Sequence, residues 1–417
     1  MKVLVVGKGA AEHALIWKLN KSKHVEKIYC SPGNAGIAEL AECIEINPPD
    51  LETYLDFIKY EWIDLIVVNE IEMLINGLVD VIEREGFRVL GLRKSASRLR
   101  YRRSHIYDLL KSSGFHLPQY RVFTSFIQAQ EYIMMKGFPI VIKTDDITND
   151  EDMFVSYTIG EAMNALKKLM KIEDSKVFSK KILIEELISG DRVTFVAFTD
   201  GKTISRPIAM YKYMYSEEGE KGSYTSGMGA YSIPDLNKYD DKYFLNIEKP
   251  LLKVFNVDDV NFRGIFSVDL IIDGEQVYVA DLKCYLGDPE IQTVIPLLGN
   301  DILEVFLSIT DNKLSNIYVV WQNLSSICVV ISKKKYGERT SDVLKIRDLD
   351  KLKNFKNLYV FHNETLFNND EIMISNKKVL SITRVGETLK EVREDIYKAI
   401  SELSFEGIYF RKDIGLI

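Results

Sequence analysis

Short apolar runs alternate with helical patterns over the first part of the chain. Residues 3–6 and 65–68 are continuous runs of Val, Leu and Ile, and helical patterns lie between them. Strands of a parallel sheet are covered on both faces, so they have such unbroken runs. The pattern predicts a parallel α/β domain over residues 1–92.

Alternating patterns replace these runs in the middle of the chain. Residues 191–198 and 204–210 alternate polar and apolar around a short turn, which predicts an antiparallel pair. Two helical patterns precede them, at residues 95–113 and 125–136, and each is followed by a glycine. The segment at residues 217–232 is rich in Gly, Ser and Tyr, and we expect it to be a loop.

The last part of the chain combines short apolar strands with a helical pattern at residues 388–403. It predicts a small α+β domain over residues 311–417. The middle region, residues 93–310, then forms a second unit with a smaller subdomain at about residues 113–186. The expected fold class is therefore α/β and α+β multidomain.

Composition and charge narrow the class of protein. The chain has 417 residues, of which 46% are hydrophobic and 28% charged, which is typical of several globular domains. A net charge of -7 argues against nucleic acid as the main partner. The four cysteines lack CxxC spacing, and no apolar run reaches membrane-spanning length. We expect a cytoplasmic protein that binds neither a membrane nor nucleic acid.

The stretch at residues 277–290, VYVADLKCYLGDPE, carries the most suggestive chemistry. Val277, Val279, Asp281 and Lys283 are expected to share one face of a strand, because side chains alternate along it. A carboxylate near a strand end, followed by a Gly-Asp-Pro turn, is a plausible place for a metal and a phosphate. An edge strand in which Asp281 and Lys283 neutralise each other is the alternative.

A glycine turn follows the first strand and opens a helix. This arrangement begins many doubly wound α/β folds. Glu12 stands where a dinucleotide fingerprint has its third glycine. A carboxylate there would repel a pyrophosphate at the helix N-terminus, so the turn is a poor dinucleotide motif.

Seven motifs occur in one order along the chain. They are Glu12-His13-Ala14 after the glycine turn, Pro32-Gly33-Asn34-Ala35-Gly36, Ile140-Val141-Ile142-Lys143, Ile184-Glu185-Glu186, Gly227-Met228-Gly229-Ala230-Tyr231-Ser232, Leu286-Gly287-Asp288-Pro289-Glu290 and Arg411-Lys412-Asp413-Ile414-Gly415. In this order the chain resembles the phosphoribosylamine–glycine ligases (glycinamide ribonucleotide synthetases), ATP-grasp enzymes of purine synthesis, along nearly its whole length. The resemblance implies a pre-ATP-grasp domain, a central ATP-grasp domain with a lid, and a C-terminal domain.

The resemblance also implies an activity and a set of site residues. The expected reaction uses ATP to phosphorylate glycine, and 5-phosphoribosylamine then attacks the acyl phosphate; the expected cofactors are ATP and magnesium. The expected oligomeric state is a monomer or a homodimer. The implied residues are Asp288 and Glu290 for catalysis; Arg103, Lys143, Glu185 and Glu186 for the nucleotide; Gly9, Glu12, His13, Asn34, Gly227, Met228 and Gly229 for the substrates; and Asp281 for the metal. For His13, a packing role is an equal alternative.

The chain departs from the family pattern at the chemistry. A glycine-rich phosphate loop of the family is replaced by the polar, acidic residues 146–152, and Glu151 stands where the family has a lysine. The family segment Asp-His-Lys-Arg begins here with Lys212. The family's two magnesium ligands, Glu and Asn, are replaced by Asp281 and Lys283. Since an ammonium has no lone pair to offer, we interpret Lys283 as a built-in counter-ion of Asp281.

Two hypotheses of different classes follow. The first is a working ligase with a remodelled site. The second is a catalytically impaired or inactive paralogue, which acts as a binding or scaffold protein on the same fold.

Overall fold

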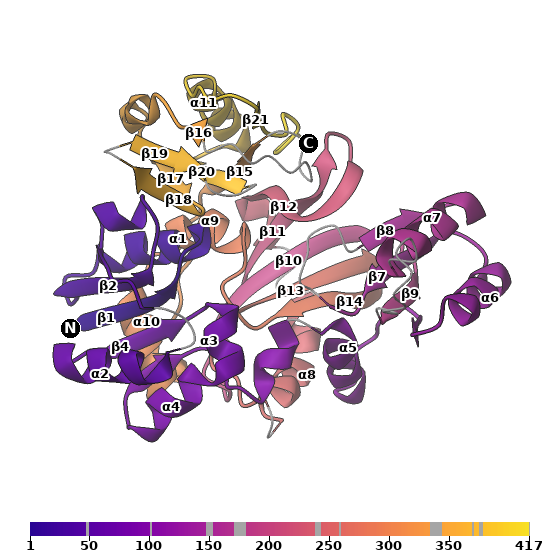
Figure 1. The fold of residues 1–417 in the computed structure, drawn as a ribbon, viewed down its shortest axis with the longest axis horizontal. Helices are drawn as coiled ribbons and strands as arrows, with labels where there is room; N and C mark the ends of the chain where they lie inside the picture. The colour runs from indigo at the N-terminus through magenta and orange to yellow at the C-terminus, as the bar shows by residue number, and fades with distance from the viewer. Residues whose placement is uncertain are drawn as a thin grey trace.

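The computed structural model of the protein describes residues 1–46, 50–100, 102–146, 153–170, 181–237, 243–257, 260–333, 344–368, 371–374 and 378–416. An N-terminal sheet with its helices and a C-terminal unit lie beside a long central sheet, and a smaller sheet projects away from it with α6 and α7 (Figure 1). This arrangement confirms the expected α/β and α+β multidomain fold. Within these described ranges, no helix is long and apolar enough to cross a membrane.

The N-terminal sheet is parallel, as the unbroken apolar runs predict. Its strand order is β3-β2-β1-β4-β5. The strands are β1 (Lys2–Gly7), β2 (Lys27–Pro32), β3 (Glu42–Cys43), β4 (Leu65–Val68) and β5 (Arg88–Leu90), and the helices are α1 (Ala10–Leu19), α2 (Leu51–Glu61), α3 (Ile71–Asn76) and α4 (Leu78–Arg84). Every residue of β4 is buried, because the strand lies between β1 and β5 and is covered on both faces.

The projecting sheet is antiparallel, with strand order β6-β9-β7-β8. Its strands are β6 (Tyr120–Phe123), β7 (Ile140–Thr144), β8 (Met153–Ser156) and β9 (Ile182–Glu186). Helices α6 (Phe126–Lys136) and α7 (Ile159–Met170) bury their apolar sides against one another and against this sheet. The sheet has its own hydrophobic core, so it can be described as a unit that is packed separately from the long sheet.

The long sheet has nine strands and is antiparallel throughout. Its order is β14-β13-β10-β11-β12-β15-β20-β17, and β21 also pairs with β15. The strands are β10 (Asp191–Thr199), β11 (Ile208–Glu217), β12 (Lys221–Ser232), β13 (Gly264–Asp273), β14 (Gln276–Lys283), β15 (Ser325–Lys333), β17 (Leu358–His362), β20 (Lys378–Gly386) and β21 (Ile408–Tyr409). The sheet therefore runs from the central region into the C-terminal region without a break.

Helices and a small sheet complete the fold. The remaining α-helices are α5 (Arg103–Ser112), α8 (Leu245–Phe255), α9 (Glu290–Val294), α10 (Ile302–Thr310) and α11 (Leu389–Ile400). The small sheet has the order β16-β19-β18, from β16 (Leu344–Lys345), β18 (Thr365–Asn368) and β19 (Glu371–Ile374). Helix α11 packs against β15 and β20 through Val392, Ile396, Ala399 and Ile400.

Two expectations about local structure are wrong. Residues 221–232 form strand β12, which pairs with β11 in a hairpin, although a loop was expected at residues 217–232. Glycine fits this strand because neighbouring groups come too close to leave room for a side chain. A Cβ on Gly229, for example, would lie 2.6 Å from the carbonyl oxygen of Cys328. The helix expected at residues 95–113 is divided into a 3-10 segment at Ala96–Arg100 and α5.

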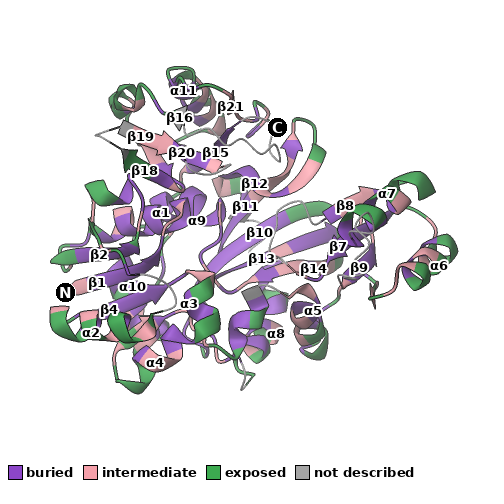
Figure 2. Cartoon of the chain, in the orientation of Figure 1, coloured by how far each residue is buried: buried purple, intermediate pink, exposed green. Residues whose placement is uncertain are grey.

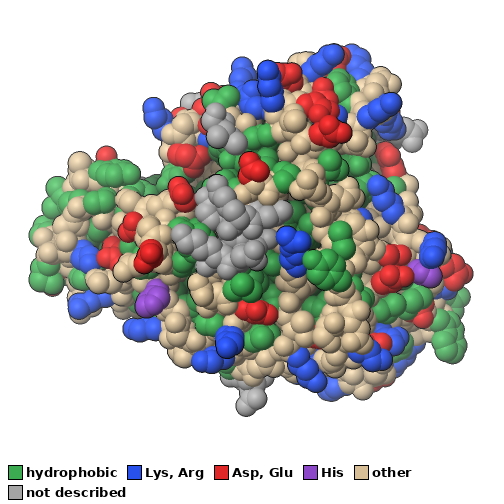
Figure 3. Space-filling model, turned by 180° about the vertical axis from the view of Figure 1, so that it is seen from behind, with side chains coloured by type: hydrophobic (Ala, Val, Ile, Leu, Met, Phe, Trp, Pro, Cys, Tyr) green, Lys and Arg blue, Asp and Glu red, His purple; other side chains and the backbone are tan. Residues whose placement is uncertain are grey.

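Burial follows the sheets. The strands of the central and N-terminal sheets are largely buried, and the outward faces of α2, α4 and α6 are exposed (Figure 2). On the face that is turned away in Figure 1, basic and acidic side chains are interspersed and do not gather into regions of one sign (Figure 3).

Candidate functional site

A cleft lies where the projecting sheet meets the long sheet. Both sheets supply charged side chains to its wall. Lys143 of β7 and Glu185 of β9 line it from the projecting sheet. Lys212 of β11 and Asp281 of β14 line it from the long sheet. Residues whose strands belong to different sheets are thus brought to one site.

A buried trio occupies the wall formed by the projecting sheet. The ammonium of Lys143 lies 2.6 Å from Oε1 of Glu185 and donates to the hydroxyl of Tyr107 at 2.8 Å. That hydroxyl donates to Oε2 of Glu185, also at 2.8 Å. Burial lowers the pKa of Lys143, and the nearby Arg103 lowers it further, against the opposing effect of Glu185. The wall therefore presents a lysine that would gain from additional negative charge.

Arg103 and Glu186 were also expected to bind the nucleotide, and each makes a hydrogen bond to the backbone beside this sheet. Arg103 donates through Nη1 to the carbonyl of Thr144 at 2.6 Å, so it holds the end of β7. Glu186 accepts from the backbone N–H of Gln119 at 2.8 Å and also lines the cleft. The four residues Arg103, Lys143, Glu185 and Glu186 therefore lie on the same part of the fold.

The opposite wall depends on a β-bulge in β14. The register pairs Leu270 with Val279 but Asp269 with Asp281, so Ala280 is an extra residue. Val279 and Leu282 are buried, whereas Asp281 and Lys283 point the other way. The expectation that Val277, Val279, Asp281 and Lys283 share one face is therefore wrong. The bulge reverses the alternation after Val279.

Two lysines meet at one carboxylate oxygen on this wall. The ammonium of Lys283 lies 2.6 Å from Oε1 of Glu290, and that of Lys212 lies 2.9 Å from the same oxygen. Lys212 also lies 2.7 Å from Oδ2 of Asp269, whose Oδ1 accepts from Thr194 at 2.7 Å. The side chains of Lys212 and Glu290 are 4% and 0% exposed, so these charges are balanced inside the protein.

The charge states on this wall follow from the contacts. Burial alone would lower the pKa of Lys212 and of Lys283, but carboxylates outweigh it and both pKa values are raised. Burial alone would raise the pKa of Glu290, but the two ammoniums outweigh it and its pKa is lowered. Burial and the neighbouring Asp269 raise the pKa of Asp281. Lys212, Lys283 and Glu290 are thus charged at neutral pH.

The interpretation of Lys283 as the counter-ion of Asp281 needs correction. The ion pair of Lys283 is with Glu290, seven residues farther along, and Asp281 feels Lys283 as a more distant charge. The cause is the turn at residues 284–289, which brings the start of α9 back beside the end of β14. Asp281 accepts only the N–H of Leu282 at 2.9 Å among the contacts of the described chain.

Magnesium, which the resemblance implies, does not fit the side chains of this wall. Mg²⁺ requires about six oxygen ligands in a near-octahedral arrangement. Both oxygens of Asp269 and Oε1 of Glu290 are already bound by protein donors. Asp281 and the buried Oε2 of Glu290 are the carboxylate oxygens left, and two ammoniums lie beside them. We therefore derive no step through a magnesium ion that this wall would hold.

Glu12 determines the shape of the N-terminal glycine turn. Its Oε2 accepts from the N–H of Gly9 at 2.7 Å, and its Oε1 accepts from the amide of Asn69. A Cβ on Gly9 would lie 2.8 Å from Oε2 of Glu12. Asn69 in turn accepts from the N–H of Leu286 at 3.1 Å. Glu12 thus acts as a buried cap for α1 and connects the turn to the segment that leads to Glu290.

Asn34 and His13 lie at the contact between the N-terminal and C-terminal regions. Asn34 accepts from the N–H groups of Gly36 and Ile37 and donates to the carbonyls of Lys8 and His362, all within 3.0 Å. His13 accepts at Nδ1 from the N–H of His362 at 2.9 Å. Burial lowers the pKa of His13. Of the two roles left open for His13, the geometry supports packing.

The glycine motif in β12 lies against the start of α9. Gly227 has φ +124°, and a Cβ there would lie 2.5 Å from Cδ of Pro289. Met228 is fully buried. Asp288 lies 3.5 Å from the ammonium of Lys378, and its Oδ1 is buried without a partner in the described parts of the chain. Asp288 and the residues around Gly227 are therefore brought together, and Asn69 links Glu12 to the same segment through the N–H of Leu286.

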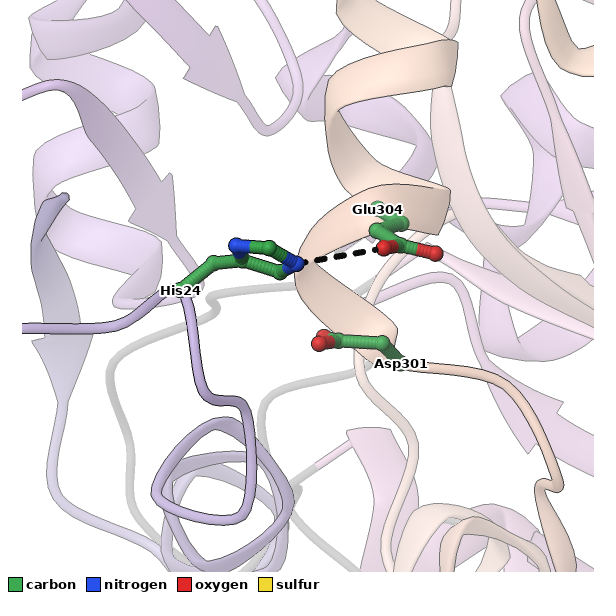
Figure 4. Close-up of side chains that lie close together, drawn as sticks. All are labelled: His24, Asp301 and Glu304. Atoms are coloured by element: carbon green, nitrogen blue, oxygen red, sulfur yellow. Dashed lines mark ion pairs between the residues drawn. The ribbon is translucent and has the colours of Figure 1, made fainter.

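A third group of ionisable side chains lies at the surface. His24, Asp301 and Glu304 approach one another at the start of α10 (Figure 4), and Nε2 of His24 lies 3.5 Å from Oε1 of Glu304. Asp301 caps α10, accepting from Leu303 N–H at 3.0 Å. A helix cap at Asp301 and an exposed pair between His24 and Glu304 account for these contacts. We therefore keep the cleft as the candidate functional site.

Three residues in or beside the cleft were not identified from the sequence. Tyr107 and Asp269 carry no motif, and Lys212 was identified only as a departure from the family pattern. A polar residue inside an apolar strand pattern, as Asp269 is among Val268, Leu270 and Ile271, is the signal that could have found Asp269. Residues 147–152, where the phosphate loop was expected to be lost, lie outside the described residues.

Comparisons with known proteins agree over the whole chain. Three family descriptions match in order: "Phosphoribosylglycinamide synthetase, N domain" at residues 1–100, "ATP-grasp (A) domain" at 102–291 and "C domain" at 326–417. A "Phosphoribosylamine--glycine ligase" of Caldanaerobacter subterraneus subsp. tengcongensis is 32% identical, covering 100% of this chain and 99% of the relative.

Solved structures show the same fold. A phosphoribosylamine–glycine ligase from Thermotoga maritima has a TM-score of 0.81 at 21% identity, covering 99% of this chain and 100% of that one. The biotin carboxylase domain of Hydrogenobacter thermophilus 2-oxoglutarate carboxylase, solved with MgADP, ADP and bicarbonate, has a TM-score of 0.72 at 13% identity, covering 98% and 91%. On the full-length sequence match, the chain belongs to the phosphoribosylglycinamide synthetase family.

Proposed function

We propose that the chain is a cytoplasmic phosphoribosylamine–glycine ligase, which joins glycine to 5-phosphoribosylamine with hydrolysis of ATP. The full-length match to proteins of that name supports this function. The observation that carries it is the buried trio of Lys143, Glu185 and Tyr107, which places a cation on the wall of the cleft between the two sheets.

The trio suits the first half of the reaction. Transfer of the γ-phosphoryl group to the glycine carboxylate gives an acyl phosphate and ADP, and it requires positive charge at the transferred group. Lys143 supplies such a charge, and Glu185 and Tyr107 fix its position. The amine of 5-phosphoribosylamine then attacks the acyl carbon, and inorganic phosphate leaves with the bonding electrons of the broken C–O bond.

A second candidate is a protein that binds a ligand in this cleft without turnover. The observation that favours it is the pairing of Glu290 with two lysines. Glu290 was expected to be catalytic, but it is fully buried and its Oε1 already accepts from Lys212 and Lys283. A carboxylate held in this way acts as a structural charge.

Phosphate release separates the two candidates. The full chain is mixed with ATP, magnesium and freshly generated 5-phosphoribosylamine, and inorganic phosphate is followed with and without glycine. The Caldanaerobacter relative, run in parallel, shows that the amine substrate is intact. Release that depends on both glycine and the amine is the expected result. If the relative releases phosphate and this chain does not, the ligase proposal is wrong and the binding protein remains.

A further inference from the structure

Two departures from the family pattern meet at one atom. Lys212 and Lys283 are 71 positions apart, on β11 and β14, and both ammoniums contact Oε1 of Glu290, at 2.9 Å and 2.6 Å. The pattern that the chain resembles has Asp at the first position and Asn, a metal ligand, at the second. Both positions have thus changed to lysine, and the two lysines bind the same carboxylate.

The charges on this wall are nearly balanced without any added ion. Asp269, Asp281 and Glu290 contribute three negative charges when ionised, and the two lysines contribute two positive charges. The side chains of Lys212 and Lys283 are 4% and 12% exposed, so solvent screens them little. Carboxylates raise the pKa of each lysine, so both remain charged over the physiological range.

A divalent cation would meet few free ligands here. Lys212 and Thr194 bind the two oxygens of Asp269, and both lysines bind Oε1 of Glu290. The oxygens that remain belong to Asp281 and to Oε2 of Glu290. A cation bound to them would lie beside two fixed ammoniums, which repel it in a poorly screened site.

We infer that the ammoniums of Lys212 and Lys283 replace a protein-held divalent cation on this wall, so that the cleft takes a phosphate-bearing ligand without one. The lysines neutralise carboxylates that would otherwise repel the ligand. A bound metal ion would balance the same negative charge. The inference concerns metal affinity, so it holds whether or not the chain turns over, and its test does not depend on activity.

Manganese binding tests the inference directly. Mn²⁺ is titrated into the full chain and free Mn²⁺ is followed by electron paramagnetic resonance. The parent protein carries His24→Ala and Glu304→Gln, which remove the surface group of Figure 4 as a competing site, and it stands for the wild type in this experiment. It is compared with Lys283→Asn and with the double variant Lys212→Asp with Lys283→Asn, both made in that parent. Thermal unfolding establishes that each variant is folded.

The expected result is that the wild type has no Mn²⁺ site that depends on Asp281. The double variant gains one site, with an affinity at least about tenfold higher, because two repelling charges are removed and two oxygen-bearing side chains take their place. That site is lost again when Asp281→Asn is added. Lys283→Asn alone gains a weaker Mn²⁺ site, and this variant provides the test if the double variant does not fold.

Two results would overturn the inference. One is a wild-type Mn²⁺ site that Asp281→Asn abolishes, since the lysines would then not replace the cation. The other is a folded Lys283→Asn or double variant that gains no affinity, since the lysines would then not be what excludes it. If neither variant folds, the Mn²⁺ titration of the wild type tests the inference by itself. The absence of an Mn²⁺ site that depends on Asp281 then supports the inference.

Discussion

The two walls of the central cleft both carry buried lysine–carboxylate contacts, but their local charge is opposite. On the projecting sheet, Lys143 has one carboxylate partner, Glu185, and its pKa is lowered. On the long sheet, Lys212 and Lys283 share three nearby carboxylates, and the pKa of each is raised. The wall on the projecting sheet, the first wall, thus has too little negative charge for its lysine. The wall on the long sheet, the second wall, has more carboxylates than lysines.

This difference separates a lysine that can bind a ligand from lysines that hold the fold together. An incoming polyanion stabilises the charged form of Lys143, because burial and Arg103 disfavour it in the free protein. The same polyanion offers Lys212 and Lys283 little, since carboxylates already stabilise their charged forms. Buried lysines in one cleft can therefore have different roles, and the direction of the pKa shift distinguishes them.

The largest effect is expected from Glu290→Gln. The change removes the carboxylate that both lysines contact, so Lys283 loses its ion pair and Lys212 keeps only the one with Asp269. Breaking a buried ion pair from one side costs about 3–5 kcal/mol. We expect a loss of this size in the free energy of unfolding at pH 7, measured by urea denaturation. Glu304→Gln, at an exposed glutamate, is the matched control and should change little. A loss no larger than that of the control would show that the second wall is not a structural charge network.

The first wall could be predicted from the sequence more fully than the second. Lys143 and Glu185 lie in two apolar strand patterns, and the antiparallel register pairs Lys143 with Leu183 and Val141 with Glu185, so the two charged residues are diagonal neighbours on β7 and β9. Local periodicity indicates the two strands, and the fold supplies this register. Their third partner, Tyr107, lies on α5 and is reached only through tertiary packing, so no local pattern indicates it.

The second wall depends on features that a period-two pattern does not contain. One extra residue at Ala280 reverses the faces of β14, and nothing in its composition marks a bulge. The contact of Lys212 with Glu290 joins residues 78 positions apart. The partner of Lys283 could not be deduced either, because the turn before α9 determines it. Family resemblance identified the positions that had changed, but only the fold shows that two of the changed residues contact the same carboxylate.

An intermediate effect is expected from Lys143→Met. Loss of a charge-assisted hydrogen bond to a phosphate costs about 1.5–3 kcal/mol, which corresponds to about a 10- to 150-fold weaker affinity. We expect a decrease of this order in the affinity for ADP, measured by isothermal titration calorimetry. Lys353→Ala, at an exposed lysine paired with Asp350, is the control. Equal ADP affinity in wild type and a folded Lys143→Met protein would remove the distinction between the two walls.

The smallest effect is expected from Asp281→Asn, and it depends on pH. Burial and Asp269 raise the pKa of Asp281 in the folded protein, so the protonated side chain is favoured there. Its contribution to stability is present below the unfolded pKa, about 3.9, and is lost as pH rises through the folded pKa. Asparagine cannot ionise, so the variant should be more stable than the wild type at pH 7, and in a chain of 417 residues each kcal/mol gained raises the unfolding midpoint by about 1 °C.

The gain from Asp281→Asn should shrink as the pH falls, because the wild-type carboxyl then takes up a proton and the two side chains become alike. Thermal unfolding from pH 4 to pH 8 in the presence of EDTA measures this, and Asp350→Asn, at an exposed carboxylate, is the control. A wild type that is more stable than the variant at pH 7 would mean that Asp281 is held as a favourable charge. The surplus of negative charge that we assign to the second wall would then be wrong, and with it the contrast between the two lysine sites.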